Sequence, residues 1–410
     1  METAVMEEAK QSSAVHDVAE LEKQYLLGTY ARFPVVFSKG KGVFVEDVNG
    51  KKYLDMISGL GVNALGYSHP RIVKVIRDQA AKLIHISNLY YNQYQGPLAK
   101  KLVEASGLAR VFFSNTGTEA MDGAIKFARA YGHKIGGDHK FKLVAATNSF
   151  HGRTYGGMSL TATAKYRDDF KPLLEGVTFI PLNDVEALRQ AVNDDTCGVF
   201  LETIQGEGGI FECTTEFLQA ARQVCHQHRA ALVLDEIQCG LGRTGEVFAF
   251  KRSGIVPDIL TVAKPIAAGL PLGAIIMSQE VADVIGAGKH GTTFGGGPLA
   301  CRVALEFLSV LEEEHLLDHI NRVGAYFHQE LVNLRDNFAV VKEVRGRGLM
   351  LALDLNVPSR PYADAALEAG ILINSTHETT LRFLPPFIVE EKHVDKTIKT
   401  LKKLLKKKIE

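Results

Sequence analysis

A lysine and two groups of polar residues each follow a short apolar run. The run ILTVA precedes Lys264, AALVL precedes Asp235, and VFF precedes SNTGTEA, which contains Thr116, Gly117 and Thr118. Removal from water lowers the pKa of an amine and frees it to form a Schiff base with a carbonyl. A glycine turn that opens a helix can bind an anion through its backbone N–H groups. These residues could therefore bind an anionic group and carry out amine chemistry.

Each group also has an ordinary structural interpretation. SNTGTEA is typical of a capped helix start, Asp235 could cap the following helix, and most lysines at strand ends are exposed. The segment SFHGRT contains Phe150, which could stack on a flat ring or lie in the core, and Arg153, which could form a surface ion pair. Ile237 could cover a ring face. The combination of an anion cradle, an aromatic ring, a carboxylate for a ring nitrogen and a reactive amine is what pyridoxal phosphate requires.

The chain between Val111 and Met277 must position these groups. Here short apolar runs alternate with helical segments, which predicts an α/β fold with a parallel sheet covered by helices. Ligands of such sheets collect at the carboxyl ends of the strands, where the polar groups lie. Seven runs are the strand candidates: Val111–Phe113, Lys142–Ala146, Val177–Pro181, Cys197–Glu202, Ala230–Asp235, Leu260–Ala263 and Leu272–Met277.

Other elements are predicted outside or between these strands. The turn signal Asp47-Val48-Asn49-Gly50 predicts a hairpin between Val43 and Asp55, and residues 1–20 are expected to form a loose arm, with order beginning near Tyr30. Three amphipathic helices are expected from apolar spacing. Their apolar stripes are Val185, Leu188 and Val192 after an Asn183 cap, then Phe217, Ala221, Val224 and Cys225, and finally Val394, Ile398, Leu401 and Leu405. The lysines of the last helix complement its dipole.

Composition limits the classes of partner and compartment. The 410 residues exceed what one simple core needs, so two lobes around a cleft are expected. The 47 basic and 47 acidic residues balance, which argues against nucleic acid or a membrane surface as a partner. No signal peptide or spanning segment is expected. The five cysteines, Cys197, Cys213, Cys225, Cys239 and Cys301, have neither disulfide-framework nor zinc spacing, so no metal and a cytoplasmic location are expected.

With these residues in view, the sequence resembles the class III aminotransferases of fold type I, and within them those that use acetylornithine. The matching motifs are TYARFPV, GKGVFVEDVNGKKYLD, FFSNTGTEA, SFHGRT, ETIQGEGG, LDEIQCGLGRTG, HGTTFGGGPLAC and ILINSTHETTLRFLPP. The resemblance implies a pyridoxal-phosphate-binding large domain at 69–296 with a mostly parallel seven-stranded sheet. It also implies a smaller α+β domain at 297–410, with the 1–68 segment against it, and a homodimer with shared active sites.

The resemblance also implies roles for individual residues. Lys264 would carry the cofactor, and Asp235 would pair with its ring nitrogen. Around the cofactor it implies Thr116, Gly117 and Thr118 at the phosphate, Phe150 and Ile237 on the ring faces, Gln238 at the phenolic oxygen, Glu236 nearby, and Thr293 reaching the phosphate bound by the partner subunit. For substrates it implies Arg153 and Thr292 at the α-carboxylate, and Arg382 at the carboxylate of 2-oxoglutarate or glutamate, with Glu207 as the acid that gates Arg382.

The implied reaction is transamination of N-acetylornithine with 2-oxoglutarate. Succinylornithine, ornithine and 4-aminobutyrate are alternative donors, and an aminomutase or a non-catalytic homologue are alternative classes. Leu60 stands near a position where an ornithine enzyme would carry a tyrosine, and an apolar residue suits an acylated substrate. Three residues depart from the family pattern: Thr203 replaces a proline, Pro265 directly follows the lysine, and Gly297 replaces an asparagine.

Overall fold

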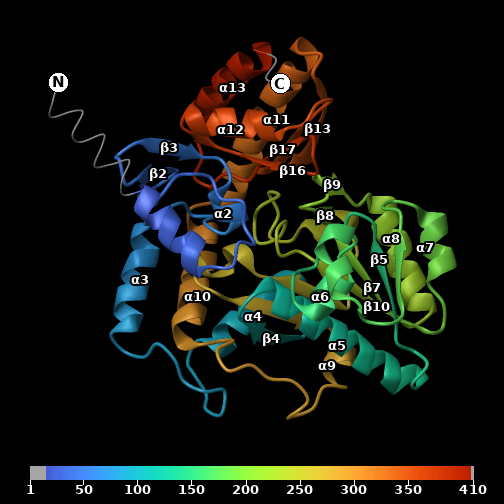
Figure 1. The fold of residues 1–410 in the computed structure, drawn as a ribbon. Coiled ribbons are helices and arrows are strands. Elements are labelled where there is room, and N and C mark those ends of the chain that lie inside the picture. The colour runs from blue at the N-terminus through green and yellow to red at the C-terminus, as the bar shows by residue number, and fades with distance from the viewer. Residues whose placement is uncertain (1–14, 408–410) are drawn as a thin grey trace, which may run out of the picture.

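A seven-stranded sheet forms the centre of the structure, a computed structural model that describes residues 15–407 (Figure 1). Its strands, in sheet order, are β4 (Arg110–Ser114), β12 (Gly273–Met277), β11 (Ile259–Val262), β10 (Ala231–Asp235), β7 (Thr196–Glu202), β5 (Lys142–Ala146) and β6 (Val177–Ile180). Neighbouring strands run parallel except at β12, which is antiparallel to both β11 and β4. The seven predicted strands and the mostly parallel sheet are confirmed.

The reversed direction of β12 has a consequence for the site. The carboxyl ends of the other six strands lie at the same edge as the beginning of β12, not its end. The segment just before Gly273 therefore borders the edge at which ligands collect. This segment precedes its strand, whereas the other ligand-binding segments follow theirs. The sequence does not reveal this difference, because the apolar pattern of a buried strand does not show its direction.

Helices cover both faces of the sheet because alternate residues of each strand point in opposite directions. Leu143 and Ala145 of β5 face α5 (Gly117–Gly136), whereas Val144 and Ala146 enter the larger cluster on the other face. That second face is covered by α8 (Thr215–Gln227). The other helices of this region are α4 (Gln95–Ser106), α6 (Tyr155–Ser159), α7 (Val185–Ala191), α9 (Gln279–Ala282), η1 (Ala164–Tyr166), η2 (Asp168–Phe170), η3 (Ala249–Ser253) and η4 (Lys264–Ala267).

Two smaller sheets lie above the central sheet in Figure 1 and join the two ends of the chain. One contains β1 (Phe37–Lys41), β2 (Phe44–Asp47), β3 (Lys52–Asp55) and β15 (Ile371–Leu372). The other contains β13 (Val341–Arg347), β14 (Met350–Leu355), β17 (Thr380–Phe383) and β16 (Asn374–Thr376). The predicted hairpin is confirmed by the β2–β3 pairing. The parallel pairing of β15 with β3 brings the N-terminal segment against the C-terminal part, whereas the domain limits at 68 and 296 stay predictions.

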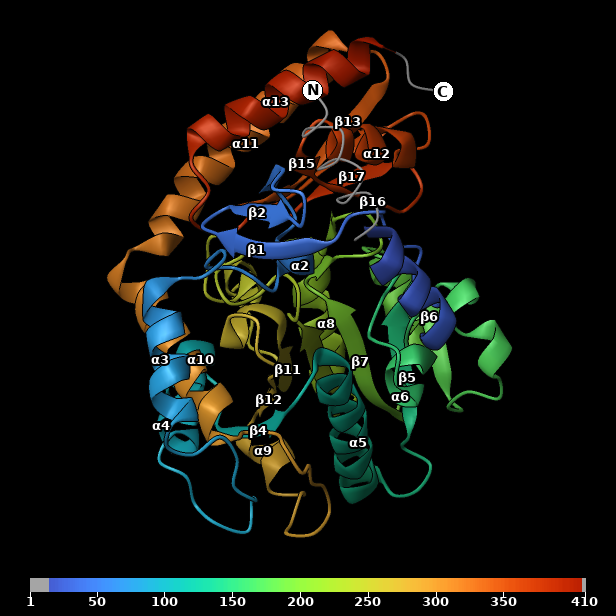
Figure 2. The same cartoon turned by 60° about the vertical axis from the view of Figure 1, so that its left-hand side comes forward.

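The remaining helices cover these smaller sheets and link them to the central one (Figures 1 and 2). They are α2 (Ser58–Gly61), α3 (Pro70–Ala80), α10 (Pro298–Glu313), α11 (Leu316–Asn337), α12 (Arg360–Glu368) and α13 (Glu391–Lys406). A short hairpin of β8 (Ile204–Gln205) and β9 (Phe211–Glu212) leaves the central sheet after β7. Among the described residues, no helix combines the length and the apolar character needed to cross a membrane.

The predicted apolar stripes of α8 and α13 are confirmed, because all of their named residues are buried. Two other predictions need correction. Helix α7 is capped by Asp184, whose carboxylate accepts the Ala187 N–H, whereas the Asn183 side chain contacts Glu212 and Thr214. Residues 15–25 are helical, mostly exposed and not a loose arm, and residues 1–14 lie outside the described part.

We expect the contribution of α8 to stability to come mainly from the burial of its apolar side chains. Phe217 is fully buried, so we expect Phe217→Ala to lower the free energy of unfolding by about 3 to 5 kcal/mol. Phe217→Leu, which leaves a smaller cavity, should cost less. Urea unfolding followed by circular dichroism measures both, and equal losses for the two variants would contradict the packing argument.

Candidate active site

A cavity of about 410 Å³ lies at the carboxyl edge of the central sheet. Five strands contribute its walls through the residues that follow or end them: Asn115–Thr118 after β4, Phe150–Arg153 after β5, Glu202 at the end of β7, Asp235, Ile237 and Gln238 at β10, and Ala263 and Lys264 after β11. Gly269–Leu272, just before β12, close another side. The structure thus brings residues that are far apart in sequence into one cavity.

The beginning of α5 forms the anion cradle predicted from SNTGTEA. Thr116 caps the helix by accepting the Glu119 N–H on its Oγ1 at 3.2 Å. The N–H groups of Gly117 and Thr118 have no acceptor within residues 15–407. A Cβ on Gly117 would lie 2.9 Å from two carbons of Ile237, so a larger residue would require the Ile237 side chain to shift. Two available donors at the positive end of a 20-residue helix suit a phosphate group.

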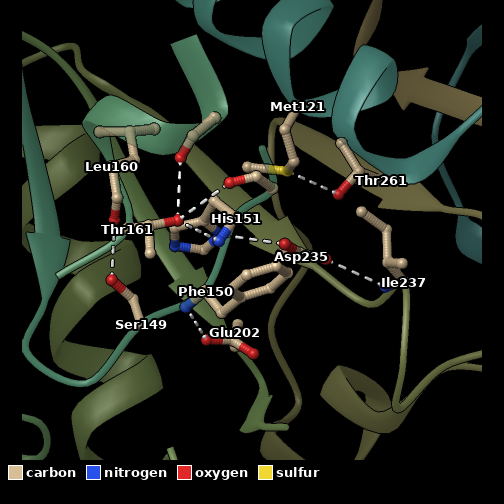
Figure 3. Close-up of polar contacts among 12 residues, drawn as sticks. Met121, Ser149, Phe150, His151, Leu160, Thr161, Glu202, Asp235, Ile237 and Thr261 are labelled. Atoms are coloured by element: carbon tan, nitrogen blue, oxygen red, sulfur yellow. Dashed lines mark hydrogen bonds and ion pairs between the residues drawn. The ribbon is translucent and has the colours of Figure 1, made fainter. Parts of the chain in front are cut away.

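Asp235 is held at the cavity by two neighbours. Its Oδ1 accepts the Ile237 N–H at 3.0 Å, and its Oδ2 lies 2.9 Å from His151 Nδ1 (Figure 3). His151 is buried, and although burial by itself lowers its pKa, the hydrogen bond and charge of Asp235 raise it overall. The Asp235 carboxylate is therefore fixed in orientation next to His151.

His151 and Glu202 are site residues to which the sequence analysis gave no role. Glu202 lines the cavity and accepts the Phe150 and Gly206 N–H groups at 2.8 and 2.9 Å. Burial raises the pKa of Glu202 to about 7. The SFHGRT motif could have indicated that His151 lies at the site. It does not indicate the partner of His151, because Asp235 is 84 positions away. Nothing in the sequence pairs them.

The expectation that Glu236 belongs to the cofactor site is not supported by this geometry. Glu236 is fully buried and does not line the cavity. Its carboxylate accepts the Ala249 and Phe250 N–H groups at 2.8 and 2.7 Å, and the Thr203 hydroxyl at 3.0 Å. Side chains alternate along the chain, so the residue after Asp235 faces away from the cavity. Thr203, one of the three residues that depart from the family pattern, thus donates a hydrogen bond to a buried carboxylate.

Lys264 extends into the cavity from the beginning of η4. Its amine forms no hydrogen bond or ion pair with any residue from 15 to 407. Removal from water lowers its pKa, although the negative charges of Glu207 and Asp235 act in the opposite direction. The backbone at Lys264 has a φ of 24°, a sparsely populated conformation. Pro265 follows at the first turn of η4, where its missing N–H leaves no donor unsatisfied.

Glu207 and Arg382 meet at one wall of the cavity. Arg382 is almost fully buried and donates from Nη1 to Glu207 Oε1 at 2.6 Å. The same Nη1 lies 3.2 Å from Gln238 Oε1 and 3.1 Å from the Gly206 carbonyl. Burial alone would raise the pKa of Glu207, but the charge of Arg382 and its hydrogen bond lower it overall. The two residues therefore form a charged pair next to the cavity.

Arg153 lies at the cavity beside two aromatic rings. Its Cζ is 3.8 Å from the ring centroid of Tyr166 and 5.5 Å from that of Phe150. The guanidinium forms no ion pair with a carboxylate among the described residues. It is exposed and remains able to bind an anionic ligand.

Thr292 and Leu60, expected near the substrate, and Thr293, expected at the phosphate bound by the partner subunit, do not line this cavity. Thr292 uses its hydroxyl oxygen to accept hydrogen bonds from Asn115 Nδ2 and the Gly295 N–H. Thr293 is exposed at the surface. Leu60, expected to contact the substrate, is 44% exposed, and Val62 is the residue of that segment that lines the cavity.

These features together fit a bound pyridoxal phosphate. The cavity contains available N–H donors for a phosphate, a fixed carboxylate for a ring nitrogen, and an amine with a lowered pKa. The Phe150 side chain and Ile237 are available to contact a flat ring. No described side chain forms a hydrogen bond or ion pair with the Lys264 amine, so the amine is available to the cofactor.

Comparison with known proteins agrees with this geometry. The family model "Aminotransferase class-III" matches residues 28–405. The chain is 48% identical over 382 residues to the acetylornithine aminotransferase of Methanocaldococcus jannaschii, covering 93% of this chain and 96% of the relative. The Aquifex aeolicus acetylornithine aminotransferase is 44% identical, with 93% and 100% covered.

Solved structures of similar proteins share the whole fold. The ornithine aminotransferase of Toxoplasma gondii superposes with a TM-score of 0.92 at 35% identity, with 96% of each chain covered. Another structure of that enzyme describes partial occupancy of PLP at the active site. The acetylornithine aminotransferase of Elizabethkingia anophelis superposes with a TM-score of 0.85 at 31% identity, with 96% and 99% covered.

The lowered pKa of Lys264 predicts a distinct pH dependence. In the apoprotein, reductive methylation with formaldehyde and cyanoborohydride should modify Lys264 at a lower pH than it modifies Nα-acetyl-lysine in the same tube, because the neutral amine is the nucleophile. Peptide mass spectrometry locates the label. Half-maximal labelling at the same pH as the reference would show that burial does not shift this amine.

Proposed function

Because the chain belongs to the class-III aminotransferase family, we propose that it transfers the δ-amino group of N-acetylornithine to 2-oxoglutarate. The products are N-acetylglutamate 5-semialdehyde and glutamate, and the reaction serves arginine biosynthesis. Pyridoxal 5′-phosphate is the cofactor. The observation that carries the proposal is the single cavity that contains the N-terminus of α5, Asp235 and Lys264, in a chain nearly half identical to acetylornithine aminotransferases.

Several residues would bind the cofactor. The N–H groups of Gly117 and Thr118, next to Thr116, would bind the phosphate, and Phe150 and Ile237 would enclose the ring. The Asp235 carboxylate would hold a proton at the ring nitrogen. Gln238 would donate its amide to the phenolic oxygen, since its Oε1 already accepts from Arg382.

Lys264 would act first as the attachment point and then as the base. The bound cofactor supplies a carbonyl that takes up the amino group and a ring that accepts an electron pair. When its amine is free, Lys264 Nζ would take a proton from the carbon of the amino donor that bears the reacting nitrogen. Its lowered pKa favours the neutral form that this step needs.

Two arginines would bind the two substrates in turn. Arg153 would bind the α-carboxylate of the amino donor. Arg382 would bind the carboxylate of glutamate or 2-oxoglutarate after its ion pair with Glu207 opens, and Glu207 would neutralise Arg382 while the donor is bound. An enzyme that must accept both an acylated amine and a dicarboxylate can in this way use one cavity.

We also propose a homodimer in which Thr293 of one subunit completes the phosphate site of the other. Thr293 lies outside its own cavity, next to the exposed Phe294. Phe294 contacts His85, and Leu89, Tyr90 and Tyr91 are exposed in the adjoining segment. Apolar side chains gathered on a surface are typical of subunit interfaces. A reducing, cytoplasmic location is supported by five buried cysteines without a disulfide.

The amino donor can be identified by mixing the holoenzyme with each candidate and following the cofactor absorbance. We expect N-acetylornithine to convert the cofactor faster than ornithine, succinylornithine or 4-aminobutyrate, and 2-oxoglutarate to restore it. Lys264→Ala should lower turnover by more than about a hundredfold, because it removes the base. Faster conversion by ornithine would reassign the substrate, and retained turnover in Lys264→Ala would contradict the role of the lysine.

Shared active sites predict complementation between two inactive variants. Lys264→Ala inactivates its own site, and Thr293→Asp should inactivate the partner's site by repelling the phosphate. In a hybrid dimer one site then contains Lys264 and the partner's Thr293, both unchanged, so co-expression should recover activity that neither variant has. If Thr293 served its own subunit, every site of the hybrid would carry a defect and no activity would return.

A further inference from the structure

We propose that Tyr166 is a specificity-determining residue that positions Arg153 for donors carrying a carboxylate. The inference deepens the proposed function, because it takes Arg153 as the group that binds the α-carboxylate of the amino donor. The preferred donors would therefore be amino acids whose reacting amine is distant from the carboxylate. Amines of the same length that lack a carboxylate would not be preferred.

The contact between the two side chains is close. The Arg153 Cζ lies 3.8 Å from the centroid of the Tyr166 ring, which also meets Phe150 edge-on, with centroids 6.0 Å apart and an interplanar angle of 84°. The ring quadrupole attracts a guanidinium at this distance. Since Arg153 makes no ion pair within the described residues, its interactions with Tyr166 and Phe150 are what hold its head group near the cavity.

Tyr166 is itself fixed by the sheet and by α6. It ends η1, and its N–H donates to the Thr163 carbonyl at 3.1 Å. The next residue, Arg167, lies over the Phe179 ring of β6 with Cζ 4.7 Å from the centroid. A few residues later, the Tyr155 hydroxyl donates to the Phe170 carbonyl at 2.9 Å. The segment that carries Tyr166 is thus attached on both sides.

Only the ring of Tyr166 contributes to this arrangement. The hydroxyl forms no hydrogen bond with residues 15–407, so phenylalanine offers a matched replacement. An exposed arginine loses rotational freedom when it binds a ligand, and a side chain already held on a ring loses less. Lys165 Nζ lies 5.1 Å from the same ring centroid and adds positive charge. The arrangement therefore favours an anionic group next to Tyr166.

The test compares N-acetylornithine with N-acetylputrescine, which is the same molecule without the carboxylate. In Tyr166→Leu, we expect kcat/KM for N-acetylornithine to fall about two- to fivefold, mainly through KM, because one cation–π contact at a partly exposed site is worth that much affinity. The value for N-acetylputrescine, as donor or as competing inhibitor, should not change. Tyr166→Phe should restore discrimination between the two.

Two results with the single variants would overturn the proposal. One is an equal loss with both compounds, which would make the ring a general wall of the cavity. The other is a Tyr166→Phe variant as impaired as Tyr166→Leu while both keep the cofactor absorbance and melting temperature of the parent. In an Arg153→Gln background, Tyr166→Leu should cause no further loss of discrimination, and an additional loss would also contradict it.

Failure of the substrate assignment gives a different result. If the unchanged protein does not convert N-acetylornithine but converts ornithine, the proposed function falls and the role of Tyr166 is tested in the same variants with ornithine and putrescine. The Ki of N-acetylnorvaline, which keeps the acyl group and carboxylate but lacks the reacting amine, measures carboxylate binding without turnover. It should rise in Tyr166→Leu by the same factor as KM.

Discussion

The removal of one lysine amine from water is the physical constraint on which this site depends. Removal from water without a hydrogen bond or ion pair lowers the pKa of an amine, and Lys264 is placed in that condition by the strained turn between β11 and η4. The surrounding structure must supply the energy for the strained φ at Lys264. It does so through a sheet in which β11 and its two neighbours are buried along their whole length.

The charges around Lys264 limit how far removal from water lowers the pKa of its amine. Glu207 and Asp235 both raise the lysine pKa, but each is already engaged, Glu207 by Arg382 and Asp235 by His151. An acid that is paired elsewhere stabilises a nearby ammonium less than an unpaired one would. The two pairs thus supply charges for ligand binding while leaving the amine able to lose its proton. Glu202, with a pKa raised to about 7 by burial, adds little negative charge at acidic pH.

Much of the fold and of the cofactor site could be predicted from the sequence, because buried parallel strands leave continuous apolar runs and ligand-binding groups follow them. Lys264, Asp235 and the Gly117 turn were singled out in this way, and the structure places them around one cavity. What the sequence did not show depends on direction and on pairing across the sheet. The Gly269–Leu272 wall was missed because β12 is reversed, and His151 because hydrogen bonding to Asp235 spans two strands. Glu236 was expected at the cofactor, but its side chain does not line the cavity because adjacent side chains point to opposite sides.

In the proposed reaction, the placement of Glu207 and Arg382 on different parts of the fold would allow one cavity to suit two substrates. Arg382 belongs to β17 of the small sheet, whereas Glu207 lies in the β8–β9 hairpin that leaves the central sheet. Arg345 of β13 joins these parts: its Nε donates to the Gly209 carbonyl of the hairpin at 2.9 Å, and its Nη2 donates to Thr380 of β17 at 3.1 Å. With the two backbones fastened in this way, we expect the proposed opening of the pair to need only rotation of the Glu207 side chain. A pair carried on unlinked loops would instead require the loops to move for every half-reaction, so the proposed alternation between substrates would be a local change around a buried arginine.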